Sequence, residues 1–228
     1  MQQTSHWHTL ETADQVADAA CQHILKAADK AIADHGKFKL VLAGGSTPEK
    51  VYGLLAKTDA DWANWVIYYG DERCLPADDV ERNSAIARRT LLDNVAIPAA
   101  QIFTIAGELG NEQAAQDYRA IVAAAMPFDM VLLGMGEDGH TASLFPGHVH
   151  DEDELVHAVN NSPKPPPERV SISAKALSNT HELIFLITGT NKREIVKVWR
   201  SGQHLPVATL IPENPVDIYI DSDALSMP

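Results

Sequence analysis

The residues best suited to chemistry lie in one glycine-rich stretch, which runs from Gly134 to Phe145. It contains His140, and histidine is the side chain that most readily exchanges a proton near neutral pH. Asp138 precedes this histidine by two residues, so its carboxylate is close enough in the chain to orient or polarise the ring. The alternative is a glycine-rich turn with an incidental histidine. The density of special residues favours a site in which His140 is a general base and Asp138 its helper.

A second stretch with chemical potential is Gly44-Gly45-Ser46-Thr47-Pro48, which follows an apolar run. Glycines let the backbone approach an oxyanion closely, the two hydroxyls add donors, and a helix beginning here adds positive potential. The stretch has neither the lysine of a P-loop nor the spacing of a dinucleotide fingerprint. It predicts a phosphate site formed by Gly44, Gly45, Ser46 and Thr47. The alternative is a tight turn in which Ser46 or Thr47 only caps the helix.

Charged residues follow another apolar run in Gly70-Asp71-Glu72-Arg73. Asp71 and Arg73 are suited to hold sugar hydroxyls, orient water or grip a phosphate, although such a cluster is often only a surface ion pair. Arg169 and Lys192 each stand beside a predicted strand end. Either is by itself an ordinary surface cation, but together with Arg73 they supply the positive charge that an anionic ligand needs.

Two other patterns predict no chemistry. His148, His150 and His157 surround the acidic run 151–154, but their spacing matches no zinc or calcium motif, so we expect no metal. The chain has two cysteines, Cys21 and Cys74, which are too few for a disulfide framework and carry no nucleophile signature. We interpret both as reduced thiols of a cytoplasmic protein.

Apolar strands alternate with amphipathic helices along the whole chain, which predicts one α/β domain over residues 1–228. Such a pattern favours a mainly parallel, Rossmann-like sheet covered by helices on both faces, a three-layer α/β/α fold. The three polar stretches then meet at the carboxyl ends of strands, where ligands bind. The predicted helices are Ala13–Gly36, Thr47–Lys57, Asn83–Asp93, Glu112–Ala125 and Lys192–Arg200, and Thr141-Ala142-Ser143 starts another. The predicted strands are Phe38–Ala43, Trp65–Tyr69, Gln101–Ile105, Asp129–Leu133, Val170–Ala174, His181–Thr188 and Val216–Ile220.

Composition limits the classes of partner. The formal net charge is -13, with 45% hydrophobic residues. A surface of this charge repels nucleic acid and anionic lipid, and no apolar stretch approaches the length of a membrane span. An anionic metabolite remains possible where backbone amides and a few cations gather. We therefore expect a small phosphorylated ligand and neither nucleic acid nor membrane as a partner.

The motifs, taken together and in order, resemble those of the glucosamine-6-phosphate isomerase/6-phosphogluconolactonase family, and of its lactonases in particular. The resemblance runs from about residue 38 to 209, and its most specific part is the string from Asp138 to Gly147. The family often has Ser-Asn-Tyr where this chain has Arg82-Asn83-Ser84, so no role is carried over to Ser84. The family resemblance rests on the segments 44–48, 70–73, 136–147, 165–169 and 189–192.

The resemblance implies a glucosamine-6-phosphate deaminase-like domain that hydrolyses 6-phospho-D-glucono-1,5-lactone to 6-phosphogluconate in the oxidative pentose phosphate pathway. It implies no cofactor and no metal, and it makes His140 the base. Phosphate would lie at Gly44–Thr47, with Arg73, Arg169 and Lys192 shared between phosphate and lactone carbonyl. We expect a monomer or a weak homodimer.

Two alternatives have the same fold. A deaminase of an amino-sugar phosphate would use Asp71 to abstract a proton, but that family typically continues its histidine string toward Phe-Asn-Glu-Pro and has tyrosine after its acidic pair. This chain has Ser143-Leu144-Phe145-Pro146 and Arg73. A sugar-phosphate sensor needs no histidine at a reacting carbon and normally carries a further module, which we do not find in the sequence.

Overall fold

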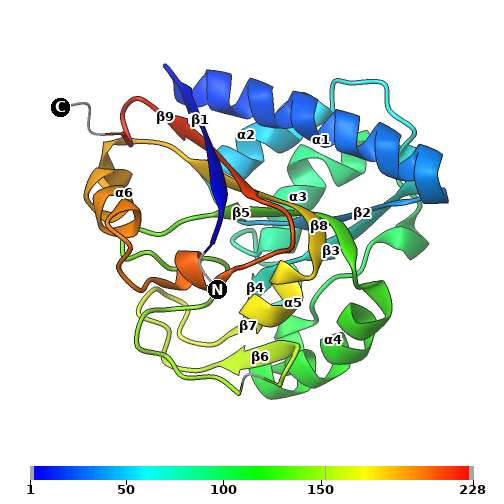
Figure 1. The fold of residues 1–228 in the computed structure, drawn as a ribbon. Helices are drawn as coiled ribbons and strands as arrows, with labels where there is room; N and C mark the ends of the chain where they lie inside the picture. The colour runs from blue at the N-terminus through cyan, green and yellow to red at the C-terminus, as the bar shows by residue number, and fades with distance from the viewer. Residues whose placement is uncertain (1–2, 152, 226–228) are drawn as a thin grey trace.

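A six-stranded parallel sheet is the centre of the protein, as the computed structural model of residues 3–151 and 153–225 shows (Figure 1). Its strand order is β1-β9-β8-β5-β2-β3. The interior strand β5 has its first six residues buried, because helices cover both faces and leave no side for polar residues. The strands are β1 (Ser5–Leu10), β2 (Phe38–Leu42), β3 (Trp65–Tyr69), β5 (Phe128–Gly134), β8 (Thr180–Ile187) and β9 (Val216–Asp221).

Helices form the two outer layers (Figure 1). On one face α1 (Ala13–His35) and α2 (Ser46–Leu55) cover the sheet, and α3 (Asn83–Thr90) packs beside α2. On the other face lie α4 (Asn111–Ala125), α5 (Ala174–Ser178) and α6 (Arg193–Arg200). Helix α1 follows a Thr12–Gln15 capping box, and Gly36 ends it, as the sequence predicts for Gly36.

A second, smaller sheet lies beside the main one, on the side of α4 and α5 (Figure 1). It is antiparallel and has the order β4-β7-β6, formed by β4 (Asp71–Arg73), β7 (Arg169–Ile172) and β6 (Val156–Val159). In register, Asp71 pairs with Ser171 and Arg73 with Arg169. This small sheet therefore brings two charged segments together that are almost a hundred residues apart in the chain.

The three-layer fold with a mainly parallel sheet is confirmed, and most predicted elements agree within one to three residues. The strand predicted at Gln101–Ile105 is wrong, because only Ile102 bridges to β3 after a short 3₁₀ helix at Ala99–Gln101. The predicted turn 70–73 contains β4, and the strand predicted at Val170–Ala174 is β7 of the small sheet. The pattern missed β1, β6 and α5.

No helix starts at Thr141-Ala142-Ser143, contrary to the prediction. Thr141 instead bridges to Leu144, its hydroxyl donates to the Gly134 carbonyl, and Ala142 has a left-handed φ of 47°. A left-handed residue stops helical propagation at once. The segment is a compact turn that places its side chains individually.

Candidate active site

A polar cavity of about 550 Å³ lies at the carboxyl ends of β2, β5 and β8, next to the small sheet. Every predicted site residue except Asp138 lines it. The turn 44–48 comes from the loop after β2, His140 from the loop after β5 and Lys192 from the loop after β8. The small sheet contributes Asp71, Arg73 and Arg169. The parallel strands thus bring the turn 44–48 and the histidine loop to one place, as expected for this class of sheet, and the small sheet adds the 70–73 motif.

His140 and Asp138 do meet. His140 Nδ1 lies 2.5 Å from Asp138 Oδ1, and its backbone N–H donates to the same oxygen at 3.2 Å. Burial alone would raise the pKa of Asp138, but the hydrogen bonds and charge of His140 outweigh it and lower this pKa. With a proton on Nδ1 donated to the carboxylate, Nε2 carries the lone pair. Among the described residues, no hydrogen bond occupies Nε2, and the ring lines the cavity.

The imidazole is held from both sides. Gly136 N–H donates to the His140 carbonyl at 2.8 Å, and a Cβ at Gly136 would lie only 2.0 Å from His140 Nδ1. The Phe145 ring packs against the imidazole with 4.6 Å between centroids. A glycine is therefore required at 136 by the closeness of the histidine, and this explains part of the glycine-rich pattern.

The turn at Gly44–Thr47 leaves the start of α2 open. The residue before the helix is Gly45, and no side chain caps it. The alternative in which Ser46 or Thr47 is the N-cap is therefore wrong. Thr47 Oγ1 instead lies 2.7 Å from Thr188 Oγ1, which ties this turn to the loop that carries Lys192. Uncapped amides at the N-terminus of a ten-residue helix are suited to an anion.

Two buried carboxylates, Asp71 and Glu72, accept hydrogen bonds from Asn83 next to the turn. Glu72 is fully buried and accepts hydrogen bonds from the backbone of Arg73, Asn83 and Ser84, so it caps α3. Ser84 takes part through its backbone, and this role is independent of the side chain at that position. Asn83 then donates to Asp71 at 3.0 Å, and a Cβ at Gly44 would lie 2.1 Å from Asn83 Oδ1. The close approach to Asn83 requires glycine at 44.

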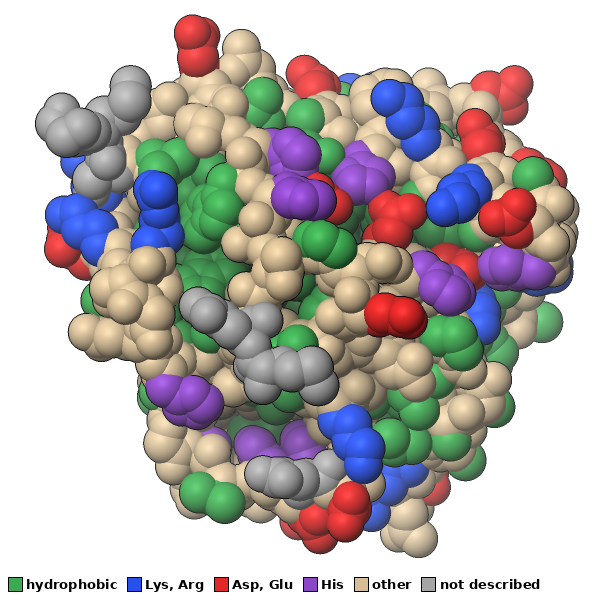
Figure 2. Space-filling model, in the orientation of Figure 1, with side chains coloured by type: hydrophobic (Ala, Val, Ile, Leu, Met, Phe, Trp, Pro, Cys, Tyr) green, Lys and Arg blue, Asp and Glu red, His purple; other side chains and the backbone are tan. Residues whose placement is uncertain are grey.

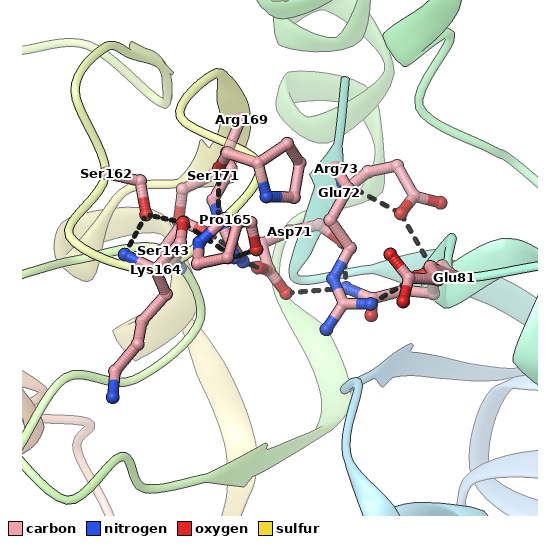
Figure 3. A network of polar contacts seen from close by, with 12 residues as sticks. Asp71, Glu72, Arg73, Glu81, Ser143, Ser162, Lys164, Pro165, Arg169 and Ser171 are labelled. Atoms are coloured by element: carbon pink, nitrogen blue, oxygen red, sulfur yellow. Dashed lines mark hydrogen bonds and ion pairs between the residues drawn. The ribbon is translucent and has the colours of Figure 1, made fainter. Parts of the chain in front are cut away.

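Asp71 connects the small sheet to the histidine loop (Figure 3). Its Oδ2 accepts a 2.6 Å hydrogen bond from the hydroxyl of Ser143, which is fully buried three residues after His140. The Ser143 N–H donates to Ser171 Oγ of β7 at 3.1 Å. Asp71 is thus fixed by Ser143 and Asn83, and its ionic contact with Arg169 is long, at 4.0 Å.

The two arginines of the small sheet donate hydrogen bonds to backbone carbonyls. Arg169 is buried and donates to Pro165 O at 2.8 Å and more weakly to Lys164 O and Pro166 O at 3.3 Å. Arg73 Nη1 donates to the Glu81 carbonyl. Both guanidinium groups still line the cavity. Arg169 therefore holds the proline-rich loop, residues 163–167, and the sequence did not predict this structural role.

Lys192 and Lys164 are the two ammonium groups of the cavity. Lys192 is half-buried, and this burial lowers its pKa, whereas the charges of Glu137 and Asp138 raise it. Lys164 was not predicted, because its proline-rich surroundings indicated only a stiff loop. Ser143 and Asn83 were also missed as site residues. Their only sequence signal is the motif that contains each of them, since no spacing rule predicts their contacts with Asp71.

Residues outside this cavity bear on the remaining predictions. Burial raises the pKa of Cys74 to about 11, so its thiol is protonated at neutral pH and is a poor nucleophile. His148, His150 and His157 do lie together along a second cavity, but the described residues form no group of three ligands arranged for a metal. Glu152 of the acidic run lies outside the described residues.

The surface charges and the helices bear on the predicted partner classes. On the face shown in Figure 2, lysine and arginine side chains are interspersed with aspartate and glutamate and form no continuous stripe. Within residues 3–151 and 153–225, no helix has the length and apolarity needed to cross a membrane.

Comparisons with known proteins define the class. The family model of glucosamine-6-phosphate isomerases/6-phosphogluconolactonase matches residues 11–219. The chain belongs to this family.

Relatives with similar sequences belong to one branch of this family, the 6-phosphogluconolactonases. The chain is 37% identical to 6-phosphogluconolactonase of Rattus norvegicus, covering 78% of this chain and 76% of the relative. It is also 37% identical to that of Mycobacterium leprae, covering 81% of both. The solved 6-phosphogluconolactonase of Thermotoga maritima superposes with a TM-score of 0.89 at 27% identity, covering 96% of this chain and 100% of the other.

Proposed function

We propose that this cavity hydrolyses 6-phospho-D-glucono-1,5-lactone to 6-phosphogluconate, the second step of the oxidative pentose phosphate pathway. The similarity to 6-phosphogluconolactonases from rat and from Mycobacterium leprae supports this activity. The observation that carries the mechanism is the His140–Asp138 pair, whose histidine lines a cavity that an uncapped helix start and several cations also line.

The reaction is acyl transfer to water. His140 Nε2 takes a proton from water as the water oxygen bonds to the lactone carbonyl carbon, and the charge of the Asp138 carboxylate stabilises the imidazolium. When the tetrahedral intermediate collapses, the bond from this carbon to the ring oxygen breaks, and the imidazolium returns the proton to that oxygen. The resulting carboxylic acid ionises at neutral pH. No cofactor or metal is needed for this sequence of steps.

Substrate binding is divided between an anion site and a carbonyl site. The open start of α2 at Gly44, Gly45, Ser46 and Thr47, joined to the Lys192 loop through Thr188, is placed to receive the phosphate. Asp71, Arg73 and Arg169 lie on the small-sheet side of the same cavity. We assign them to the sugar hydroxyls and to the negative charge that develops on the carbonyl oxygen.

We further propose that the 228 residues act as one domain, as a monomer or weak homodimer in the cytoplasm, without nucleic acid or membrane as a partner. The interspersed charges of the surface in Figure 2 and the net charge of -13 support this proposal. Sedimentation velocity of the purified protein and fractionation of the cells that produce it are the direct tests.

The test of activity uses freshly prepared 6-phosphogluconolactone, with acid release followed in a pH-stat. The spontaneous rate of hydrolysis is measured in the same buffer and subtracted. We expect a rate that is proportional to protein concentration. A rate equal to the spontaneous one would refute the activity. Ammonia release from glucosamine 6-phosphate, measured in parallel, would instead establish a deaminase.

A further inference from the structure

Two lysines of the cavity differ from most charged groups around them. Asp71 is held by Ser143 and Asn83, and Arg169 by the proline-rich loop. Within residues 3–151 and 153–225, by contrast, neither Lys164 Nζ nor Lys192 Nζ has a carboxylate within the 4.0 Å of an ion pair. Both line the same cavity. In a chain of net charge -13, two unpaired ammonium groups in one cavity indicate an anionic ligand.

The backbone of Lys164 is fixed although its side chain is exposed. Its N–H donates to Ser162 Oγ at 3.2 Å, and its carbonyl accepts from the Ser162 hydroxyl at 2.7 Å and from Arg169 at 3.3 Å. Figure 3 shows the lysine side chain extending away from these contacts and from Asp71. The loop therefore presents the ammonium group from a rigid base, which reduces the entropy lost when it binds a ligand.

The carboxylate of Glu137 interacts electrostatically with both lysines but is hydrogen-bonded to a neighbouring side chain. Glu137 accepts a 2.6 Å hydrogen bond from Asn191 Nδ2. This bond, and then the charges of Lys192 and Lys164, lower the pKa of Glu137. Lys164 also contributes, after burial, to the lowered pKa of Lys192, because the two ammonium groups repel each other. An anion bound between them removes this repulsion.

We propose that Lys164 is a specificity-determining residue that binds the substrate's phosphate together with Lys192. A phosphate dianion matches two cations, and the Thr47–Thr188 contact already brings the Lys192 loop to the open start of α2. Arg169 acts as a positioning residue for Lys164, because its guanidinium holds the carbonyls of the loop that presents the lysine. This inference rests on the proposed function, since it assigns one more residue to the same phosphate site.

The test compares Lys164→Met, Lys164→Arg and the control Lys30→Met, which removes an exposed lysine of α1 that does not line the cavity. For 6-phosphogluconolactone we expect Lys164→Met to raise KM about tenfold with kcat within about twofold, as losing one exposed charge-assisted contact predicts. KM for unphosphorylated D-glucono-1,5-lactone should not change. Lys164→Arg should restore most of the affinity, and Lys30→Met should behave like the original protein.

Binding is measured independently of turnover, by titration calorimetry with 6-phosphogluconate and with inorganic phosphate. We expect Lys164→Met to weaken both by about tenfold. Unchanged affinity for both, or equal rises in KM for the phosphorylated and unphosphorylated lactones, would overturn the proposal. If the original protein binds 6-phosphogluconate through Lys164 but does not hydrolyse the lactone, the proposed function fails while the assignment of Lys164 stands.

Discussion

The two sheets contribute to the cavity in different ways. Loops after the parallel strands β2, β5 and β8 carry the open helix start, His140 and Lys192, and each of these presents a free donor or acceptor to the cavity. The antiparallel sheet contributes Asp71 and Arg169, whose polar atoms are largely used in contacts with the protein itself. The parallel sheet therefore supplies the base and the open helix start, and the small sheet adds further charged groups to the cavity while holding the histidine loop in place.

The Ser143–Asp71 hydrogen bond is where the two parts meet (Figure 3). Because Ser143 follows His140 by three residues in a compact turn, fixing its hydroxyl also fixes the histidine loop. Substitutions of the base or of its immediate partners should therefore change the chemical step directly. Substitutions that break only the link between the two sheets should act less strongly and through position.

His140→Gln should have the largest effect, because glutamine retains a polar side chain but is no base. We expect kcat to fall by roughly 10²–10⁴-fold, the usual contribution of a general base. Binding of 6-phosphogluconate, measured by calorimetry, should stay within about twofold. Undiminished turnover would remove His140 from the mechanism.

Gly136→Ala tests the close packing of the backbone against the His140 imidazole without changing the histidine. The new Cβ would meet His140 Nδ1 at 2.0 Å and Asp138 Oδ1 at 2.7 Å, so the pair must move. A displacement of about 1 Å at a reacting group costs on the order of 100-fold in kcat. Gly53→Ala in α2 is the control, because a Cβ there has no neighbour within 4 Å and Gly53 does not line the cavity. An equal fall in kcat in the two variants would show that the packing of Gly136 against His140 does not position the base.

Asp138→Asn removes the charge that orients and stabilises the imidazolium. We expect kcat to fall about 10- to 100-fold, the worth of one hydrogen bond to a charged group, with KM little changed. A full rate in this variant would show that the histidine works without its partner.

The pH dependence of stability tests the same pair. The pKa of Asp138 is lowered in the folded protein, so its stabilising contribution is present above the ordinary aspartate value of about 3.9 and is lost as the pH falls through the lowered pKa. The difference in unfolding free energy between the original protein and Asp138→Asn should therefore shrink below about pH 4. Urea titrations at several pH values measure it, and a difference that grows in acid would contradict the assignment.

Ser143→Ala should have the smallest effect on catalysis, because it acts through position. Loss of one hydrogen bond to a buried carboxylate predicts a five- to tenfold lower kcat and a loss of about 1–3 kcal/mol in unfolding free energy. Ser178→Ala in α5 is the control, since it also removes one hydroxyl donor, here to the Ala174 carbonyl, but lies outside the cavity. It should lose stability and retain kcat. If both variants lose kcat equally, the link between the sheets has no special role.

The difference between the two sheets also explains which parts of the fold and of the site the sequence predicted and which it did not. The apolar runs of β2, β3, β5 and β8 are buried on both faces, so their pattern is strong and the polar motifs at their ends could be placed together. The small sheet has strands of three or four residues, too short for any periodicity, and its pairing joins segments distant in the chain. The contacts of Ser143 and Arg169 depend on that pairing. The sequence therefore predicted Arg169 as a substrate-binding residue, but it did not predict that Arg169 holds the loop at residues 164–166.

The orientation of the substrate is the most direct test of the account, and a crystal structure with bound 6-phosphogluconate would measure it. We predict the phosphate at the start of α2 with Lys192, and the carboxylate carbon on the His140 side, with a carboxylate oxygen about 3 Å from Nε2. A phosphate bound at His140, with the carboxylate at the Gly44–Thr47 turn, would contradict the assignment of base and anion site together.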